Sequence, residues 1–452
     1  MNTAQIRKLF DRLFQKFGAQ GDILSVLQRA GLTMVIQVGA SGLSYGSQVF
    51  LARWMGAYEF GIYVFAWSLV QPTAVAAAIG LSLAAVRFVP QYLTKDRLSH
   101  LHGLIRRSMI IVFSLGMIIA AGGWLGLEVV DSLLAEYYRM PVRLGLLCIP
   151  FLTLIAMMSG VSRGFGWVGL TYVPQLLSVP GILLVAAGVF TLSVGQPTAV
   201  VVLIMAVFAC ATTALAHVSR FRRAIPENIK SSKPSYATQL WLRVALPLFL
   251  SDGIFLILWN VDTIMLGSIM GPDEVAVYHA CVKTAGLTLI FFNGITAFAA
   301  PKFAALIVDD NRASQQQFVR SIAMWMFWPT LGVVMALLVI GPFILGTFGP
   351  SFVVGQPALV ILAFGYLVQA STGPTSAYLA VSGNHDMIMV TNASAAISNI
   401  LLNIVMIPMA GVVGAAIASV LSILLFQIWS YVLVRRRLRI NPVFFANTQV
   451  KG

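Results

Sequence analysis

Long apolar segments that are almost free of charge dominate this sequence. Stretches 108–127, 198–218 and 412–434 contain no Asp, Glu, Lys or Arg. Each has the length of about 20 residues that a helix needs to cross the ~30 Å hydrocarbon core of a bilayer. Because lipid offers no hydrogen-bonding partners, a segment of this length satisfies its backbone groups internally, as a helix. The sequence therefore predicts an all-α polytopic membrane protein.

The composition of the whole chain supports the same class. Of the 452 residues, 59% are hydrophobic and 10% are charged, and the mean hydropathy is +0.88. A soluble protein of this length needs far more polar residues to cover its surface. At about 20 residues per span, we expect about twelve transmembrane helices, at roughly 31–53, 60–86, 108–128, 143–162, 170–193, 198–218, 241–268, 275–300, 318–345, 353–380, 387–409 and 412–434.

The basic residues follow the loops between these segments, and the formal net charge is +14. All but four of the 29 Lys and Arg fall at the N-terminus, in alternate loops or in the C-terminal tail; the exceptions are Arg53, Arg139, Arg143 and Lys283. Since basic loops stay on the cytoplasmic side of a membrane, this pattern predicts that both termini are cytoplasmic. The bases form no single face or stripe, so we expect no nucleic-acid partner.

Two short segments are similar to each other: LARWMGAYEFGIY at 51–63 and LGSIMGPDEVAVY at 266–278. Glu carries most weight in this match because it occurs only five times in the chain. An offset of 215 residues brings the Gly, Glu and Tyr of the first copy, Gly56, Glu59 and Tyr63, onto Gly271, Glu274 and Tyr278. The match indicates an internal duplication. An offset of six helices predicts two six-helix bundles related by a pseudo-twofold axis along the membrane normal, with a cavity between them.

The chain outside the bundles is basic or amphipathic. Apolar and basic residues alternate at helical spacing near the N-terminus, which predicts a helix lying on the anionic cytoplasmic leaflet and not a cleaved signal peptide. We therefore expect five parts: an amphipathic segment 1–29, an N-terminal bundle 30–218, a basic cytoplasmic linker 219–240, a C-terminal bundle 241–434 and a basic cytoplasmic tail 435–452.

Five ionisable residues within or at the ends of predicted spans are candidates for function. Each costs about 2.5 to 3.5 kcal/mol at the centre of a span, so each needs a partner or a hydrated cavity. Lys283 lies deep in the eighth span with His279 one turn before it on the same face. Asp252 and Asp262 lie in the seventh span, and Arg53 ends the first. Lys283 is a candidate for the cavity or for an ion pair with either aspartate, and Arg53 is a candidate for the cavity or for snorkelling to the interface.

The chain has few signals for metal or cofactor chemistry. Cys148, Cys210 and Cys281 all fall within predicted spans without the spacing of a metal or redox motif. No GxxxxGK[ST] loop is present to hold nucleotide phosphates. We therefore expect no metal, no cofactor and no ATP hydrolysis.

Four segments together resemble a known family. They are the first hairpin ARWMGAYEFGIYVFAWSLVQPTAVAAAIGLSLAAVRFVPQY, then WNVDTIMLGSIMGPDEVAVYHA, AYLAVSGNHDMIMVTNA and IPMAGVVGAAIASVLS. They are similar to the polysaccharide transporter (Wzx-type) flippases, in the superfamily that also holds MATE drug exporters and the lipid II flippase MurJ. The resemblance runs from about residue 30 to residue 434.

This resemblance implies a flippase that moves a polyprenyl-diphosphate-linked oligosaccharide, an O-antigen, capsule or exopolysaccharide repeat unit, across a bacterial inner membrane. It implies alternating access driven by H+, Na+ or the membrane potential, with membrane lipids and a polysaccharide polymerase as further partners. Cationic side chains suit the diphosphate, which makes Arg53, Lys283 and His279 candidates for phosphate binding. Asp252 and Asp262 are candidates for ion coupling.

The repeated corner has a structural interpretation. After Gly56 and Gly271, Glu59 and Glu274 fall in the first turn of the following helix, where the helix dipole favours a carboxylate. The two corners are not equivalent, since Ser268 stands where the first copy has Arg53. Sugar recognition needs side chains that bind hydroxyls, such as Asn293, Gln369 and Asn399, whose relation to the cavity the sequence leaves open.

Three alternatives compete with this function. A MATE-like exporter of organic cations would favour an acidic and aromatic pocket. A lipid II-type flippase has the same architecture. An O-antigen polymerase or ligase would need a large periplasmic loop, whereas the longest predicted one runs only from about 128 to 143. We therefore expect that the protein is not an enzyme.

Overall fold

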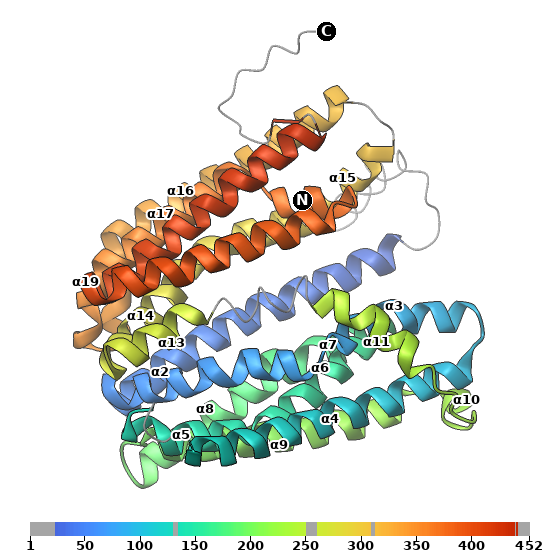
Figure 1. The fold of residues 1–452 in the computed structure, drawn as a ribbon, viewed down its shortest axis with the longest axis horizontal. Helices are drawn as coiled ribbons and strands as arrows, with labels where there is room; N and C mark the ends of the chain where they lie inside the picture. The colour runs from blue at the N-terminus through green and yellow to red at the C-terminus, as the bar shows by residue number, and fades with distance from the viewer. Residues whose placement is uncertain (1–22, 130–133, 250–259, 309–311, 439, 442–452) are drawn as a thin grey trace, which may run out of the picture.

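The computed structural model describes residues 23–129, 134–249, 260–308, 312–438 and 440–441. Within these ranges every regular element is a helix (Figure 1). The first part of the predicted N-terminal segment and most of the predicted tail lie outside the described residues. The all-α prediction is confirmed.

The N-terminal bundle is built from long helices with short links. It comprises α2 (Ile23–Ala77), α3 (Leu81–Thr94), α4 (Leu98–Val129), α5 (Glu136–Leu146), α6 (Ile149–Gly164), α7 (Val168–Val173), η3 (Pro174–Ser178), α8 (Val179–Ser193) and α9 (Ala199–Ala224).

The C-terminal bundle follows after the short linker helix α10 (Glu227–Lys230). It comprises α11 (Thr238–Leu248), α13 (Val261–Ile269), α14 (Pro272–Ala285), η5 (Gly286–Thr288), α15 (Leu289–Val308), α16 (Arg312–Phe348), η6 (Pro350–Gly355), α17 (Gln356–Ser371), α18 (Thr375–Val381), α19 (His385–Leu433) and η7 (Val434–Leu438).

The helices have the lengths that membrane crossing requires. Among the described residues, eight helices are long and apolar enough to span a bilayer, and α5 and α6 form a ninth span bent by 42°. Two of the eight, Ile36–Ala77 and Asp386–Arg437, have 42 and 52 residues, enough for two crossings each. They turn at Gly56 (φ 78) and Gly411 (φ 52), in the left-handed region that favours glycine. With α11 and α13 on either side of residues 250–259, these spans make the predicted two bundles of six helices.

The two copies of the repeated segment have the same local structure. Gly56 and Gly271 both have positive φ, at 78 and 149. A helix runs on from each of them, and Tyr63 and Tyr278 are both buried, at 2% and 1% exposure. The duplicated sequence therefore forms a duplicated corner, one in each bundle.

The molecule has two distinct ends (Figure 1). The end with the turns at Gly56, Gly271 and Gly411 is called the corner end. The opposite end, called the basic end, holds the loop at 95–97, the linker and η7. The bundles lie together at the corner end, and α15 to α19 spread away from the N-terminal bundle toward the basic end, where α11 packs against α3 and α4. The first limb of α2 lies between the two groups of helices. At the corner end α2 packs against α13, α14 and α16 of the other bundle.

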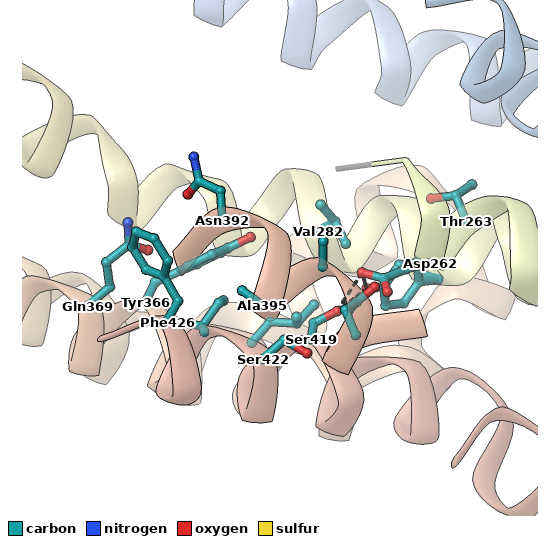
Figure 2. Close-up of a pocket in the computed structure, with 15 residues that line it drawn as sticks. Asp262, Thr263, Val282, Tyr366, Gln369, Asn392, Ala395, Ser419, Ser422 and Phe426 are labelled. Atoms are coloured by element: carbon teal, nitrogen blue, oxygen red, sulfur yellow. Dashed lines mark hydrogen bonds between the residues drawn. The ribbon is translucent and has the colours of Figure 1, made fainter. Parts of the chain in front are cut away.

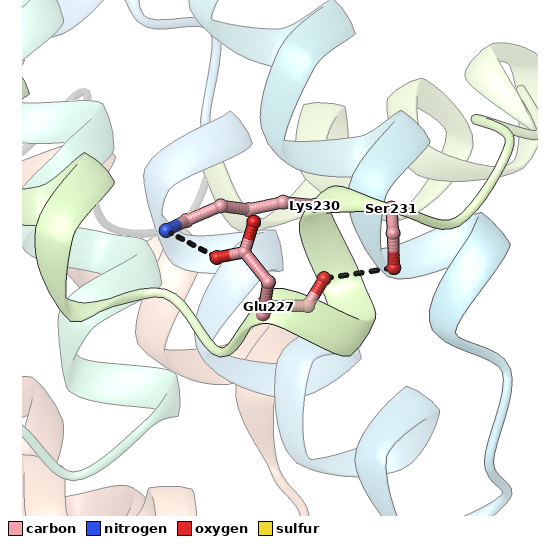
Figure 3. A network of polar contacts seen from close by, with 3 residues as sticks. All are labelled: Glu227, Lys230 and Ser231. Atoms are coloured by element: carbon pink, nitrogen blue, oxygen red, sulfur yellow. Dashed lines mark hydrogen bonds and ion pairs between the residues drawn. The ribbon is translucent and has the colours of Figure 1, made fainter.

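The linker is ordered and lies on the N-terminal bundle. In α10, Lys230 Nζ forms an ion pair with Glu227 Oε2 at 3.0 Å (Figure 3). The backbone N–H of Ser235 donates to the carbonyl of Ser99 at 2.9 Å, and the carbonyl of Ser232 lies 2.7 Å from His102 Nδ1. These contacts attach the linker to the start of α4.

Candidate functional site

A cavity of about 180 Å³ lies inside the C-terminal bundle (Figure 2). Its walls come from α13, α14, α17 and both limbs of α19. The turn at Gly411 brings the two limbs of α19 close together. A Cβ added to Gly414, on the second limb, would lie only 1.9 Å from the carbonyl oxygen of Met406, on the first limb. This close approach lets α19 supply side chains to the cavity from residues on both sides of the turn.

Asp262 is the centre of a hydrogen-bond network at one end of the cavity. Its Oδ2 accepts from Ser419 Oγ at 2.6 Å and from Tyr278 Oη at 3.0 Å. Its Oδ1 accepts from Asn403 Nδ2, which also donates to Asn399 Oδ1 at 3.1 Å. The network joins α13, α14 and both limbs of α19, so four segments position one carboxylate.

Within the described part of the chain, the charge of Asp262 is not balanced by a base. All the donors to its oxygens are neutral, and among the described residues no Lys, Arg or His forms an ion pair with it. The ion pair with Lys283 that the sequence leaves open is therefore absent from the described part. The described residues contain no group of three or more His, Cys, Asp and Glu suited to a metal ion.

The other end of the cavity is lined by amides and aromatic rings. Tyr366 and Gln369 come from α17, and Asn392 and Phe426 come from the two limbs of α19 (Figure 2). Gln369 and Asn399, both candidates from the sequence for binding hydroxyls, line the cavity, whereas Asn293 does not. Tyr366, Asn392 and Phe426 were not predicted. Their signal in the sequence is weak, because polar or aromatic residues in a span are common and nothing shows which ones face inward.

Lys283 lies on α14, outside this cavity but next to it. Its neighbour Val282 lines the cavity, while Lys283 itself is exposed. One turn earlier, His279 Nε2 lies 3.2 Å from Gln48 Oε1 of α2. Lys283 shares this face of α14, which is the face directed at the N-terminal bundle. Lys283 is ~17 Å along the helix from Pro272, the first residue of α14, at 1.5 Å per residue.

A second polar contact joins the same two helices. Tyr45 Oη lies 3.0 Å from Thr284 Oγ1. Together with the contact between Gln48 and His279, it connects the first limb of α2 to α14. His279 is thus engaged across the two bundles in this conformation.

Arg53 is bound by the opposite bundle. Its Nε donates to the carbonyl oxygen of Thr347 at 2.6 Å, and its Nη2 donates to that of Gly346 at 3.4 Å. These carbonyls belong to the last turn of α16, where helix carbonyls lack intrahelical partners and attract a cation. Ser268, the equivalent residue in the second copy, donates only to Ile264 O of its own helix, at 2.9 Å. The Arg53 side chain therefore binds the opposite bundle, whereas the Ser268 hydroxyl bonds within its own helix.

Glu59 and Glu274, the glutamates of the two corners, have different positions and contacts. Glu59 Oε2 accepts the backbone N–H of Ala199 at 2.6 Å. Ala199 is the first residue of α9, so Glu59 caps a helix that begins 140 residues later in the sequence. Glu59 also lies in the first turn of the helix that follows Gly56. Glu274 lies in the first turn of α14 after Gly271, as the sequence predicts. Asp252, the other candidate for ion coupling, lies outside the described residues.

The crossing of α2 and α14 is unusually close. A Cβ on Gly61 would lie 1.8 Å from the carbonyl oxygen of Pro272. The equivalent of Gly61 in the second copy is Ala276, so only the first copy has the glycine. The bundles therefore meet at the corner end through backbone contact as well as through Arg53.

The two-bundle fold occurs in solved transporter structures. An inward-facing conformation of a multidrug resistance MATE family transporter of the MOP superfamily is 16% identical, with a TM-score of 0.74, over 90% of this chain and 98% of that one. The lipid II flippase MurJ in an inward closed conformation is 13% identical, with a TM-score of 0.68, over 89% and 87%. These similarities show that the chain shares its fold with these two proteins.

The family follows from the sequence match. Residues 26–307 match the model of the family described as polysaccharide biosynthesis protein, and the chain belongs to this family. An uncharacterized membrane protein of Methanocaldococcus jannaschii is 22% identical over 420 residues, which cover 86% of this chain and 80% of that protein. The resemblance that the four sequence segments carry is thus confirmed.

Proposed function

We propose that this protein is a flippase for polyprenyl-diphosphate-linked oligosaccharides, moving the headgroup from the cytoplasmic to the periplasmic leaflet. One observation carries the proposal: Lys283 is an exposed cation on the face of α14 that is directed at the N-terminal bundle, beside a polar cavity whose lining contains no base. Such a headgroup combines an anionic diphosphate with sugar hydroxyls. It needs a cationic and hydrated path through the hydrocarbon core.

In this proposal the three basic candidates act in sequence. Lys283 contacts the diphosphate in the conformation described here. His279 and Arg53 already have partners, Gln48 and the end of α16, that belong to the opposite bundle. When the bundles part at the corner end, both side chains lose these partners and become available to phosphate.

Asp262 is the coupling residue in this proposal. Binding of H+ or Na+ neutralises its charge and changes the network that joins α13, α14 and α19. Because both limbs of α19 and the middle of α14 are in this network, a change at one carboxylate affects three helices of the C-terminal bundle. The gradient of that ion then drives the cycle.

The setting follows from the charge distribution. We place the basic end in the cytoplasm and the protein in the inner membrane of a bacterium, with both termini cytoplasmic. Membrane lipids surround it, and a polysaccharide polymerase on the periplasmic side is the class of partner that consumes the product.

The test is headgroup translocation in proteoliposomes. A polyprenyl-diphosphate lipid with a short fluorescent oligosaccharide is reconstituted with the wild-type protein, and the rate is measured with and without a pH or sodium gradient. We expect translocation that Lys283→Ala reduces by about tenfold or more, as for the loss of a charge-assisted hydrogen bond. A wild-type protein that moves no such lipid under any gradient contradicts the proposal.

The coupling residue has its own test in the same vesicles. Asp262→Asn keeps the shape of the side chain and removes its charge, so we expect the rate under a gradient to fall to the rate without one. Asp273→Asn is the control, because Asp273 is exposed at the corner end. Full gradient dependence in Asp262→Asn would exclude Asp262 as the coupling site.

A MATE-like exporter of organic cations is the second candidate. The observation that favours it is the pairing of the Asp262 carboxylate with the rings of Tyr366 and Phe426 in one cavity, since cations bind to carboxylates and aromatic faces. Gradient-driven export of a fluorescent organic cation from the same vesicles, without lipid translocation, would establish this function in place of the first.

A further inference from the structure

The far end of the cavity has the chemistry of a site for a neutral polyol. We propose that Tyr366, Gln369, Asn392 and Phe426 form a glycosyl subsite, which holds the sugar next to the diphosphate while the phosphates stay at Lys283. This inference rests on the proposed flippase function and assigns the sugar and the phosphate to neighbouring places.

The charge of the lining excludes a phosphate from the cavity itself. Its lining contains no Lys, Arg or His, and the carboxylate of Asp262 is its charged group. A diphosphate entering it would meet a negative charge and no cation. A sugar without charge carries no such penalty.

The polar groups at this end are available to a ligand. Tyr366, Gln369 and Asn392 are each half-buried. The hydrogen bonds between the residues of Figure 2 are at the Asp262 end, and none joins these three side chains to one another. A carboxamide offers two donors and one acceptor, and a phenol offers one of each. Adjacent sugar hydroxyls, which both donate and accept, match this set.

The aromatic rings complete the match. Tyr366 and Phe426 lie beside Gln369 in Figure 2. A sugar ring has an apolar face of C–H groups that packs on an aromatic ring, while its hydroxyls point outward to the amides. Pockets that combine apolar walls with a few placed polar groups are the usual form of small-molecule sites.

The position of Lys283 connects this subsite with the phosphates. Val282 is in the wall of the cavity and Lys283 is the next residue on α14. Successive residues on a helix point about 100° apart, so Lys283 lies on the adjoining face of α14, which is directed at α2. A sugar in the cavity and a phosphate at Lys283 are then neighbours, as the glycosyl phosphate bond requires.

The experiment compares two lipids in proteoliposomes. One is a sugar-free polyprenyl diphosphate, and the other carries the single sugar that the wild type moves fastest among neutral hexose and N-acetylhexosamine probes. For Gln369→Ala and Asn392→Ala we expect the rate for the sugar lipid to fall about fivefold or more at low lipid concentration. The rate for the sugar-free lipid changes less than about twofold, whereas Lys283→Ala slows both lipids.

Controls separate the subsite from a general defect. Asn293→Ala removes an exposed amide of the same bundle outside the cavity, and we expect both rates to stay unchanged. Asn392→Gln keeps the amide and recovers part of the sugar-lipid rate, and each variant is checked for a single peak in size-exclusion chromatography.

The outcomes distinguish the two proposals. The glycosyl subsite is overturned if Gln369→Ala and Asn392→Ala reduce the translocation rates of both lipids equally, or reduce neither rate. In that case translocation by the wild type still supports the flippase function. A wild type that moves neither lipid overturns both.

Discussion

Single polar residues hold distant helices of this protein together. Glu59 reaches the start of α9, and Asp262 gathers hydroxyl and amide donors from two other helices. In a membrane interior, water is not available to satisfy such groups, so each must find a protein partner or open into a cavity. The positions of the few polar side chains therefore carry much of the information about packing.

The capping role of Glu59 predicts a loss of stability on its removal. Glu59→Ala leaves the N–H of Ala199 without its acceptor and removes a negative charge from the N-terminus of α9. We expect the free energy of unfolding in mild detergent to fall by about 1 to 2 kcal/mol. Glu128→Ala, at the exposed end of α4, serves as the control, and an equal loss in both variants would exclude the cap.

Helices are brought into contact by glycine at particular crossings. Of the α2 glycines whose surroundings the structure describes, only Gly61 lies against the backbone of another helix, with an added Cβ 1.8 Å from a carbonyl oxygen. Gly42, by contrast, has no atom within 4 Å of an added Cβ. The same residue type thus serves a packing role at one position and none at another. The physical reason is that a crossing this close has no room for a side chain.

This difference predicts opposite effects of one substitution in one helix. Gly61→Ala forces α2 away from α14 at Pro272, and we expect a loss of about 1 to 3 kcal/mol in the free energy of unfolding. Gly42→Ala removes backbone freedom without a clash, and we expect no loss or a gain of up to about 1 kcal/mol. Thermal unfolding in detergent measures both, and equal melting temperatures would contradict the close crossing.

The two bundles are held together at the corner end, whereas α15 to α19 lie away from the N-terminal bundle toward the basic end. In the proposed alternating-access cycle, the contacts at the corner end break when the basic end closes. Arg53 is suited to such a contact because it is exposed and binds two backbone carbonyls of the opposite bundle. When this contact breaks, the guanidinium of Arg53 lies in a hydrated opening. Water then replaces the two carbonyls, so the free-energy cost of losing them is small.

Removing Arg53 is expected to loosen the corner end. Spin labels on Ala135→Cys and Ser351→Cys, which lie in opposite bundles and are exposed, report the separation by pulsed electron spin resonance. Arg53→Ala should give a longer and broader distance distribution than the wild type, with Arg53→Lys between them. The native cysteines are buried and do not take the label.

Ser268→Ala is the matched control for this measurement, because Ser268 stands at the equivalent place in the second corner and bonds only within its own helix. We expect its distance distribution to equal that of the wild type. An unchanged distribution in Arg53→Ala would show that Arg53 does not hold the bundles together.

Much of the fold was predictable because its cause is local. The length and hydrophobicity of the segments predicted the spans, and the repeated corner predicted two related bundles. Asp262 and Lys283 were recognisable as candidates because a charge in an apolar segment is rare. The partners of these residues were not predictable, since Asn403 and Ser419 are ordinary polar residues until the turn at Gly411 brings them to Asp262.

The sequence by itself determined that the chain is a helical membrane protein with two similar halves, because burial in lipid depends on each segment alone. The tertiary structure decided which side chains share a cavity, that Glu59 caps α9, and that Arg53 binds the end of α16. Those contacts join residues more than a hundred positions apart, and they depend on how helices cross. Crossing is set by the summed packing of many side chains, which no short stretch of sequence contains.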